Sequence, residues 1–176
     1  SGQKRKEQII KFIKNHPDQS GIVYCLSRKS TEKLASDLIQ AGFNARSYHA
    51  GMDAVSRAKV QDDFIKDEVP IICATIAFGM GIDKSNVRWV IHYNLPKNLE
   101  NYYQEIGRAG RDSAPADTLL FYSYQDVMML TDILQKNESE NLEVQLAKLG
   151  RMQQYAESMA CRRRILLNYF NEDQKD

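Results

Sequence analysis

The residues best suited to chemistry stand in one stretch, 104–112, which reads Gln-Glu-Ile-Gly-Arg-Ala-Gly-Arg-Asp. Its two arginines, Arg108 and Arg111, carry planar guanidinium groups that are always charged and that match the geometry of phosphate oxygens. Gly107 and Gly110 have no side chains to stand between those groups and a bulky anion. The stretch therefore predicts a site that binds phosphate and neutralises its negative charge.

Two backbone conformations fit this stretch. On a continuous helix, Gln104, Arg108 and Arg111 lie on one side because they are separated by four and three residues. An apolar face at helical spacing would pack the other side against the protein: Leu99, Tyr102, Tyr103 and Ile106. Alternatively, the helix ends at Gly107 and the arginines lie on a tight turn directly after it. Solvated surface arginines behind an ordinary helix end are the simplest alternative.

The segments around this stretch alternate between strands and helices. Short apolar runs predict strands at 21–26, 44–48, 69–74, 87–93 and 116–122. Helical spacing predicts helices at 3–14, 31–41, 54–66 and 125–135, besides the one that Asn98 caps. This alternation is typical of βαβ units, so the predicted fold class is α/β with a parallel sheet flanked by helices. In such sheets the loops at the carboxyl ends of the strands form the binding site.

Polar residues and glycines define several helix boundaries. Ser30 is the expected N-cap of the helix 31–41, because its hydroxyl can accept a hydrogen bond from a backbone N–H of the first turn. Gly42 is expected to close that helix, since glycine adopts the left-handed conformation of a helix end at little cost. Asp53 is the expected N-cap of the helix 54–66.

The composition changes after residue 136. A polar break at 137–140 precedes a long amphipathic helix over 142–156 and a second over 159–170. We expect these two helices to form a hairpin outside the sheet. The predicted domains are therefore 1–136, which contains the sheet, and 137–176, which contains the hairpin.

Composition places the 176-residue chain among ordinary globular proteins, with 43% hydrophobic and 27% charged residues. Its three cysteines lie far apart, no run is apolar enough to span a membrane, and no signal-peptide pattern occurs, so the cytoplasm is the expected location. Net charge is only +1, although residues 1–14 carry five basic groups and one acidic group. Contact with a polyanion must therefore be local and made by individual groups.

Four of these segments together resemble the second RecA-like domain of superfamily 2 helicases, and most closely the RecQ family of DNA helicases. Residues 21–34 resemble the family's motif IV region, and Tyr-His-Ala-Gly at 48–51 resembles its segment of that sequence. Ala-Thr-Ile-Ala-Phe-Gly-Met-Gly-Ile-Asp-Lys at 74–84 is similar to motif V, and 103–112 is similar to motif VI. The resemblance covers nearly the whole chain.

The resemblance implies roles in nucleotide chemistry. Arg111 is implied to be an arginine finger that reaches the γ-phosphate of ATP bound by another domain, with Arg108 assisting and Gln104 sensing the nucleotide. Nucleotide contacts are implied for Asp83, Gly81 and Gly107. For Asp83, contact with the ribose, attachment of motif VI and an ordinary turn aspartate are all left open.

Six residues are candidates for contact with the DNA backbone: Thr75, Ser27, Arg28, His49, Gly51 and Arg57. Hydroxyls, an imidazole and loop amides bind phosphate without reading base sequence. A satisfied structural role is equally compatible with His49, and Ser27 also fits a residue at the start of a helix. His92 is more typical of a structural residue. Cys25 and Cys73 lie in apolar strands and are expected in the core.

Two departures from the family pattern limit what the chain can do alone. No Gly-x-x-x-x-Gly-Lys-[Ser/Thr] pattern and no Asp-Glu pair after an apolar strand is present, so ATP and Mg²⁺ would be held by a first RecA-like domain preceding residue 1. The chain alone is therefore predicted to be inactive. Cys161 matches the first of the family's four zinc-ligand cysteines, but no later cysteine follows it, so Zn²⁺ is expected only in a longer parent protein.

The predicted function is the carboxyl-terminal motor half of an ATP-dependent DNA helicase in DNA repair and recombination, with 3′-to-5′ polarity implied by the resemblance. Its partners would be DNA and the preceding RecA-like domain, in the cytosol or nucleoid of a bacterium. One alternative is half of a DEAD-box RNA helicase, which the motif V sequence and the hairpin bearing Cys161 disfavour. Another is a non-catalytic nucleic-acid-binding adaptor, which an open reading frame beginning near residue 1 would favour.

Overall fold

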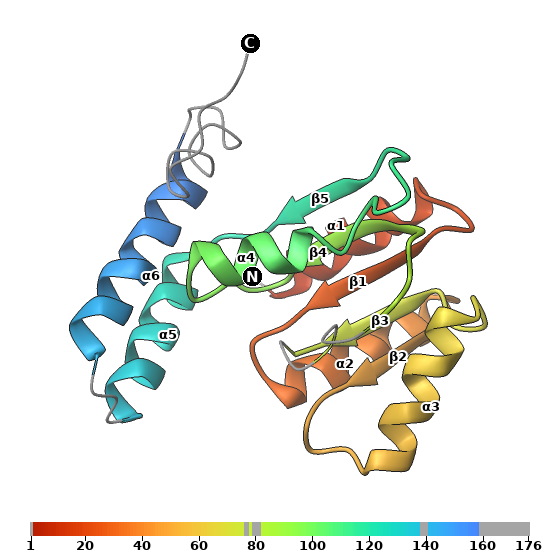
Figure 1. Ribbon diagram of the computed structural model, residues 1–176, viewed down its shortest axis with the longest axis horizontal. Helices are drawn as coiled ribbons and strands as arrows, with labels where there is room; N and C mark the ends of the chain where they lie inside the picture. The colour runs from red at the N-terminus through yellow and green to blue at the C-terminus, as the bar shows by residue number, and fades with distance from the viewer. Residues whose placement is uncertain (1, 76–77, 79–81, 138–140, 159–176) are drawn as a thin grey trace. The chain divides into compact units, whose positions relative to one another are not determined.

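A computed structural model describes residues 2–75, 78, 82–137 and 141–158 (Figure 1). Its helices and strands, in chain order, are α1 Gly2–Lys14, β1 Ser20–Tyr24, α2 Arg28–Gln40, β2 Ala45–Tyr48, α3 Ala54–Ile65, β3 Ile71–Ala74, β4 Val87–His92, α4 Leu99–Ile106, β5 Asp117–Leu120, α5 Tyr124–Lys136 and α6 Leu142–Glu157. None of the described helices is both long and apolar enough to cross a membrane.

The chain divides into two compact units. Residues 1–94 and 105–121 form the first unit, which holds all strands of the sheet, and residues 95–104 and 122–176 belong to the second. Helix α4 is shared, because Leu99–Gln104 belong to the second unit and the helix ends in the first. Helix α5 groups with α6 in the second unit, although the sequence pattern had assigned it to the domain 1–136.

The first unit is built on a five-stranded sheet in the order β2-β3-β1-β4-β5, in which every neighbouring pair is parallel. The central strand β1 is buried along its whole length, as the apolar run of its sequence predicts. Val23 lies opposite Cys73 on one side and Ile91 on the other. The predicted α/β fold with a parallel sheet is thereby confirmed.

Helices cover both faces of this sheet. On one face, Ile9 of α1 and Leu38 of α2 pack in a core cluster with alternate strand residues such as Val23. On the other face, Phe64 of α3 packs in a second cluster with Ile72 and its neighbours. Cys25 and Cys73 are buried in the first cluster, as their apolar surroundings in the sequence predicted. The alternation of strand side chains thus separates two cores, one on each face.

Glycine at position 21 is required by a close approach between β1 and β4. A Cβ atom on Gly21 would lie 1.9 Å from Cδ2 of Trp89, which is fully buried on β4. Trp89 in turn meets the ring of Phe12 edge-on at a centroid distance of 5.9 Å. The indole therefore fills the space that a side chain at position 21 would need.

Helix boundaries confirm some of the predicted caps and correct one. Asp53 caps α3, since its side chain accepts a hydrogen bond of 2.8 Å from the backbone N–H of Ser56. Gly42 follows α2 with a φ of +94°, as expected of a residue that closes a helix. The prediction that Ser30 caps α2 is wrong. Ser27 is the cap, because its extended backbone directs its hydroxyl to accept from the N–H of Ser30 at 3.1 Å.

The second unit contains the helix pair α5 and α6, which lie side by side (Figure 1). Tyr155 of α6 packs against Tyr102 of α4 with ring centroids 5.4 Å apart. The carboxylate of Asp126, buried on α5, accepts a hydrogen bond from the backbone N–H of Leu95. Helix α6 matches the predicted helix over 142–156. The hairpin that this helix was predicted to form with 159–170 stays a prediction, because 159–170 lies outside the described residues.

Candidate functional site

The two arginines lie on a turn and not on a helix. Helix α4 ends at Ile106, and Gly110 adopts a φ of +67°, which a continuing helix cannot contain. The N–H of Gly110 donates a hydrogen bond of 2.9 Å to the carbonyl of Val87 on β4. A Cβ at position 110 would lie 3.1 Å from the carbonyl oxygen of Ala114. Of the two predicted conformations, the structure has the second, and we call residues 107–111 the arginine turn.

The apolar face predicted for α4 is only partly correct. Leu99 and Tyr102 are buried, but the side chain of Tyr103 is 52% exposed. Helix α4 spans the whole predicted pattern, Leu99–Ile106, but Ile106 is only half-buried, so the buried face is narrower than predicted. Asn98 caps this helix as predicted, since its side chain accepts a hydrogen bond of 2.8 Å from the N–H of Asn101.

Arg108 points inward, toward the end of β1. It is half-buried, and its Nε is buried without a hydrogen-bond partner among the described residues. Burial and the nearby Glu105 carboxylate raise the pKa of Tyr24 well above its usual value, while the guanidinium groups of Arg108 and Arg111 oppose that rise. The Tyr24 hydroxyl therefore lies within electrostatic reach of three charged groups from 105–111.

Arg111 points outward. Its side chain is exposed, and its Nε donates a hydrogen bond of 3.2 Å to the carbonyl of Gly107 within the same turn. This bond fixes the direction of the guanidinium group while the group stays at the surface. The turn thus presents one arginine to the protein interior and one to the exterior.

Glu105, which has no role in the sequence-based predictions, is one of two buried carboxylates among the described residues. It is 8% exposed, and its Oε2 lies 3.1 Å from Nε2 of His92 at the end of β4. The His92 ring stacks on Tyr24, with centroids 5.4 Å apart and planes inclined by 22°. The helical spacing offered a clue, because Glu105 stands three residues after the buried Tyr102 and so falls on the same side of α4. The expectation that His92 is structural agrees with its burial.

Asp112 is held at the other end of the turn. Its carboxylate forms an ion pair with Arg88 of β4, and its N–H donates a hydrogen bond of 3.2 Å to the carbonyl of Ser85. The hydrogen bond from Arg88 and the attraction of its charge lower the pKa of Asp112. Arg88 also donates to the carbonyl of Pro115 at 3.1 Å. Arg88 has no role in the sequence-based predictions, because its partner lies 24 residues away.

The other residues predicted to contact nucleotide have separate surroundings. Asp83 is exposed, while the neighbouring Lys84 is buried and pairs with Asp67 at 2.5 Å. Gly107 is exposed within the arginine turn, and Gln104 is exposed on the part of α4 that belongs to the second unit. Gly81 lies outside the described residues.

Five of the six residues predicted to contact DNA follow three adjacent strands. Ser27 and Arg28 follow β1, His49 and Gly51 follow β2, and Thr75 follows β3. Because the order β2-β3-β1 makes these strands neighbours, their carboxyl-terminal loops meet at one edge of the sheet. Direct contacts join two pairs of these loops. The N–H of Thr75 donates to the carbonyl of Tyr48, and a Cβ on Gly51 would lie 2.9 Å from Nη1 of Arg28.

His49 organises the loop after β2 from a buried position. Its Nδ1 accepts a hydrogen bond of 3.1 Å from the N–H of Gly51, which places the ring hydrogen on Nε2 when the ring is neutral. Nε2 then donates to Glu32 of α2 at 2.8 Å. Both ring nitrogens are engaged within the protein, which favours the structural interpretation of this histidine. Arg57 of α3 is half-buried, and its Nε is buried without a partner among the described residues.

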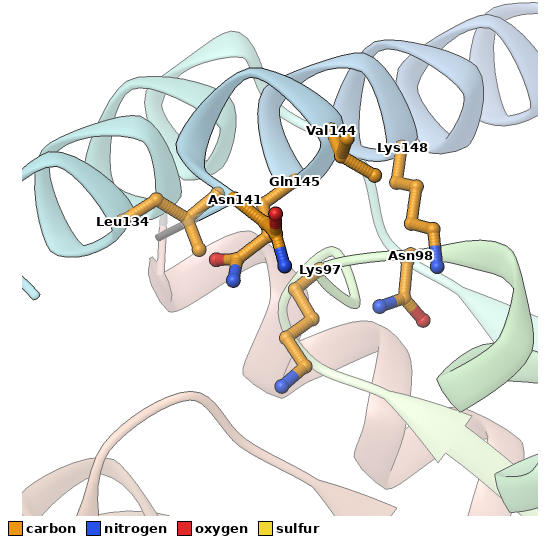
Figure 2. A pocket seen from close by; sticks show the side chains of 7 residues that line it. All are labelled: Lys97, Asn98, Leu134, Asn141, Val144, Gln145 and Lys148. Atoms are coloured by element: carbon orange, nitrogen blue, oxygen red, sulfur yellow. The ribbon is translucent and has the colours of Figure 1, made fainter. Parts of the chain in front are cut away.

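Metal ligands are not found in the described part of the chain, where no three His, Cys, Asp or Glu residues form a group that suits a metal ion. Cys161, the implied zinc ligand, lies outside it. The second unit contains a cavity of about 300 Å³ with a mixed polar and apolar lining. Figure 2 shows the residues that line it: Lys97, Asn98, Leu134, Asn141, Val144, Gln145 and Lys148. Lys148 is paired with Glu100 at 3.1 Å, so one of its two lysines is already neutralised.

Comparison with known proteins matches two families to this chain. The helicase conserved C-terminal domain family matches residues 4–113, and the RecQ zinc-binding family matches residues 124–176. The ATP-dependent DNA helicase RecQ of Pasteurella multocida is 47% identical over 173 residues, which are 98% of this chain. The chain spans only 27% of the length of that relative.

Two solved structures support the fold. A DEAD box protein from the hyperthermophile Methanococcus jannaschii matches 76% of this chain and 37% of its own, with a TM-score of 0.63 and 29% identity. The helicase Lhr of Mycobacterium smegmatis, bound to ssDNA and AMP-PNP, matches 80% of this chain and 19% of its own, with a TM-score of 0.59 and 25% identity.

Proposed function

Because this chain belongs to the RecQ family of helicases, we propose that it forms the second motor domain of an ATP-dependent DNA helicase acting with 3′-to-5′ polarity. ATP and Mg²⁺ would be bound mainly by a first RecA-like domain, since the sequence here contains no phosphate-binding loop. This chain would contribute the groups that complete the nucleotide site and part of the grip on DNA. Repair and recombination of DNA are the processes that such an activity serves.

The main support for a role in ATP hydrolysis is the geometry of the arginine turn. Arg111 is exposed with its direction fixed by the Gly107 carbonyl, and the turn itself is bonded to β4. An arginine finger needs this combination, because it must reach a phosphate on a facing domain and must arrive there in a defined orientation. Arg108, which faces inward beside Tyr24, would support the turn and assist from there.

Contact with DNA is assigned to the loops after β1, β2 and β3. Arg28 is an exposed cation at this edge, and the half-buried Thr75 supplies a hydroxyl and loop backbone. His49 and Gly51 would support the loop that lies against Arg28. Such contacts bind phosphate and are indifferent to base sequence, as a motor that travels along DNA requires.

Zinc binding is proposed only for a longer protein that contains this chain. Cys161 would be one of four thiolate ligands, and the other three would have to follow Asp176. We also propose a cytoplasmic location, because the chain belongs to the RecQ family.

Replacement of Arg111 tests the nucleotide role. In a full-length protein that contains this chain, Arg111→Ala should lower the DNA-stimulated kcat for ATP hydrolysis by at least about 10³, the low end for arginine fingers. KM for ATP should change far less, because a charge felt mainly in the transition state lowers kcat. Arg111→Lys should not restore the rate, since an ammonium group does not reproduce the planar fork.

The matched control is Arg46→Ala, which removes an exposed arginine from the edge strand β2. It should leave kcat unchanged. A folded Arg111→Ala variant with near-normal kcat would show that Arg111 is not the finger and would transfer the assignment to Arg108. Circular dichroism spectra establish that each variant is folded.

A further inference from the structure

Two acidic residues flank the arginine turn, and both are bonded to the same strand. Glu105 precedes the turn and pairs with His92, the last residue of β4. Asp112 follows the turn and pairs with Arg88, near the beginning of β4. From this arrangement we infer that His92 and Arg88, through Glu105 and Asp112, are positioning residues for Arg111. The inference rests on the proposed function of the arginine turn.

The strand geometry explains why one strand can hold both ends. Side chains at positions 88, 90 and 92 project from the same face of β4, because successive residues of a strand alternate between faces. Val90 belongs to the core cluster on the face that α3 covers, and Ile106 and Ala109 pack against that cluster. Residues 105–112 therefore run along β4 on this face, attached near both ends of the strand.

The His92–Glu105 pair is buried and has a defined environment. His92 is 2% exposed, and its ring stacks on Tyr24. The position of Nε2 is therefore fixed independently of Glu105. Removal of either residue of a buried pair leaves the carboxylate or the imidazole of the other residue buried without its partner. The last turn of α4 can therefore occupy few positions while this pair is intact.

The Arg88–Asp112 pair is more accessible but has additional bonds. Arg88 also donates to the carbonyls of Pro115 and Asn86, and the Asp112 carboxylate accepts from the N–H of Ala114. Between the two pairs, the hydrogen bond from Gly110 to Val87 fixes the middle of the turn. Three attachments to one rigid strand thus restrict the turn that carries both arginines.

Restriction of this kind affects catalysis because the benefit of a guanidinium group depends on where it lies in the transition state. A displacement of about 1 Å can cost about 10²-fold in rate even when the displaced group is chemically intact. Loss of either pair should therefore act through Arg111. Such a loss should lower kcat by displacing Arg111, although the arginine itself is still present. The affinities for ATP and DNA should change little.

The test uses a full-length protein that contains this chain and measures steady-state ATP hydrolysis with DNA. We expect Glu105→Ala and Asp112→Ala to lower kcat roughly 10- to 100-fold with little change in KM. Glu105→Gln and Asp112→Asn should retain most of the rate, because an amide oxygen still accepts a hydrogen bond from His92 or Arg88. Asp117→Ala is the matched control, since it removes the ion pair between the edge strand β5 and His16 and should leave kcat unchanged.

The decisive measurement repeats the two alanine substitutions in the Arg111→Ala background. If the pairs act by positioning Arg111, each should then lower kcat by less than about threefold, because residues that act as a unit are not additive. Full losses in both backgrounds would indicate general damage to the domain and would overturn the inference. If Glu105→Ala does not fold, the more accessible Asp112 pair still decides the question.

Failure of the inference is distinguishable from failure of the proposed function. Should Arg111→Ala lower kcat as proposed while Glu105→Ala and Asp112→Ala remain at the unsubstituted rate, the arginine finger stands and the positioning role is wrong. Should Arg111→Ala itself leave kcat unchanged, the proposed function falls and the inference falls with it.

Discussion

Nε2 of His16 lies 2.7 Å from Oδ2 of Asp117, which joins the segment after α1 to the edge strand β5. Nδ1 of the same ring lies 2.7 Å from the carbonyl oxygen of Phe12, and the ring stacks on that phenylalanine at 4.1 Å. Both ring nitrogens therefore face acceptors. Only the doubly protonated imidazolium can donate to both at once.

This pair should make stability depend on pH. Burial lowers the pKa of His16, but the hydrogen bonds to Asp117 and Phe12 outweigh it and raise the pKa above 6.5. Because the folded pKa is raised, the stabilisation is fully present below pH 6.5 and is lost as pH rises through the folded pKa. Urea denaturation at about pH 5.5 and about pH 9 should show that His16→Gln is the more destabilising at the lower pH, by at most about 1 kcal/mol. An equal effect at both pH values would contradict this prediction.

The packing of Trp89 against Gly21 predicts a severe effect of a small substitution. Gly21→Ala should lower the free energy of unfolding by about 3 kcal/mol or more, because its Cβ would overlap the indole ring. Gly150→Ala is the control. Position 150 is inside α6, and a methyl group added there would meet nothing within 4 Å, so alanine should stabilise by about 0.5–1 kcal/mol. Chemical denaturation of both variants gives the comparison.

The cap of α2 can be identified by two single substitutions. Ser27→Ala should cost about 1 kcal/mol of unfolding free energy, since the N–H of Ser30 loses its acceptor. Ser30→Ala should cost less, because its hydroxyl meets only that of Ser27 at 2.8 Å. The reverse order in thermal or chemical denaturation would restore Ser30 as the cap.

Binding of DNA by this chain should be weak, independent of base sequence and strongly weakened by salt. The candidate contacts go to phosphate, and neutralising phosphates releases counterions. Arg28→Ala should reduce the slope of log K against log salt by about 1, whereas Arg46→Ala at the amino end of β2 should not change it. Fluorescence anisotropy on unrelated oligonucleotides measures both. A strong preference for one sequence would refute the assignment to phosphate contacts.

The 176 residues alone should hydrolyse no ATP, because their sequence contains no phosphate-binding loop. The measurement is phosphate release by the purified chain with and without DNA. DNA-stimulated hydrolysis would contradict the proposed division of the site between two domains.

Sequence patterns predicted the helices and strands of this fold better than they predicted which residues contact one another. The continuous apolar run at 21–26 indicated a fully buried parallel strand, and β1 is one. The cap of α2 was missed because Ser27 and Ser30 are both hydroxyl residues near the same helix start, and only backbone conformation separates them. Helical spacing placed Tyr103 on the apolar face of α4, and the prediction treated that whole face as buried.

The attachments of the arginine turn were beyond the reach of these patterns. His92 pairs with a residue 13 positions away and Arg88 with one 24 positions away, so no helical or strand period relates them. Their proximity depends on where residues 105–112 cross β4, which is decided by tertiary packing. The two arginines themselves were identifiable because their chemistry and close spacing are local properties.

The strand order has a consequence for synthesis on the ribosome. Strand β1 pairs with β3 and β4, so its buried residues must wait until Ile71–Ala74 have been made. At about 5–20 residues per second, the roughly 50 residues between β1 and β3 take about 2.5–10 s to add. Throughout that interval the nascent chain carries an apolar strand without its lateral neighbours. During this interval the unpaired strand is an apolar segment of the kind that chaperones bind.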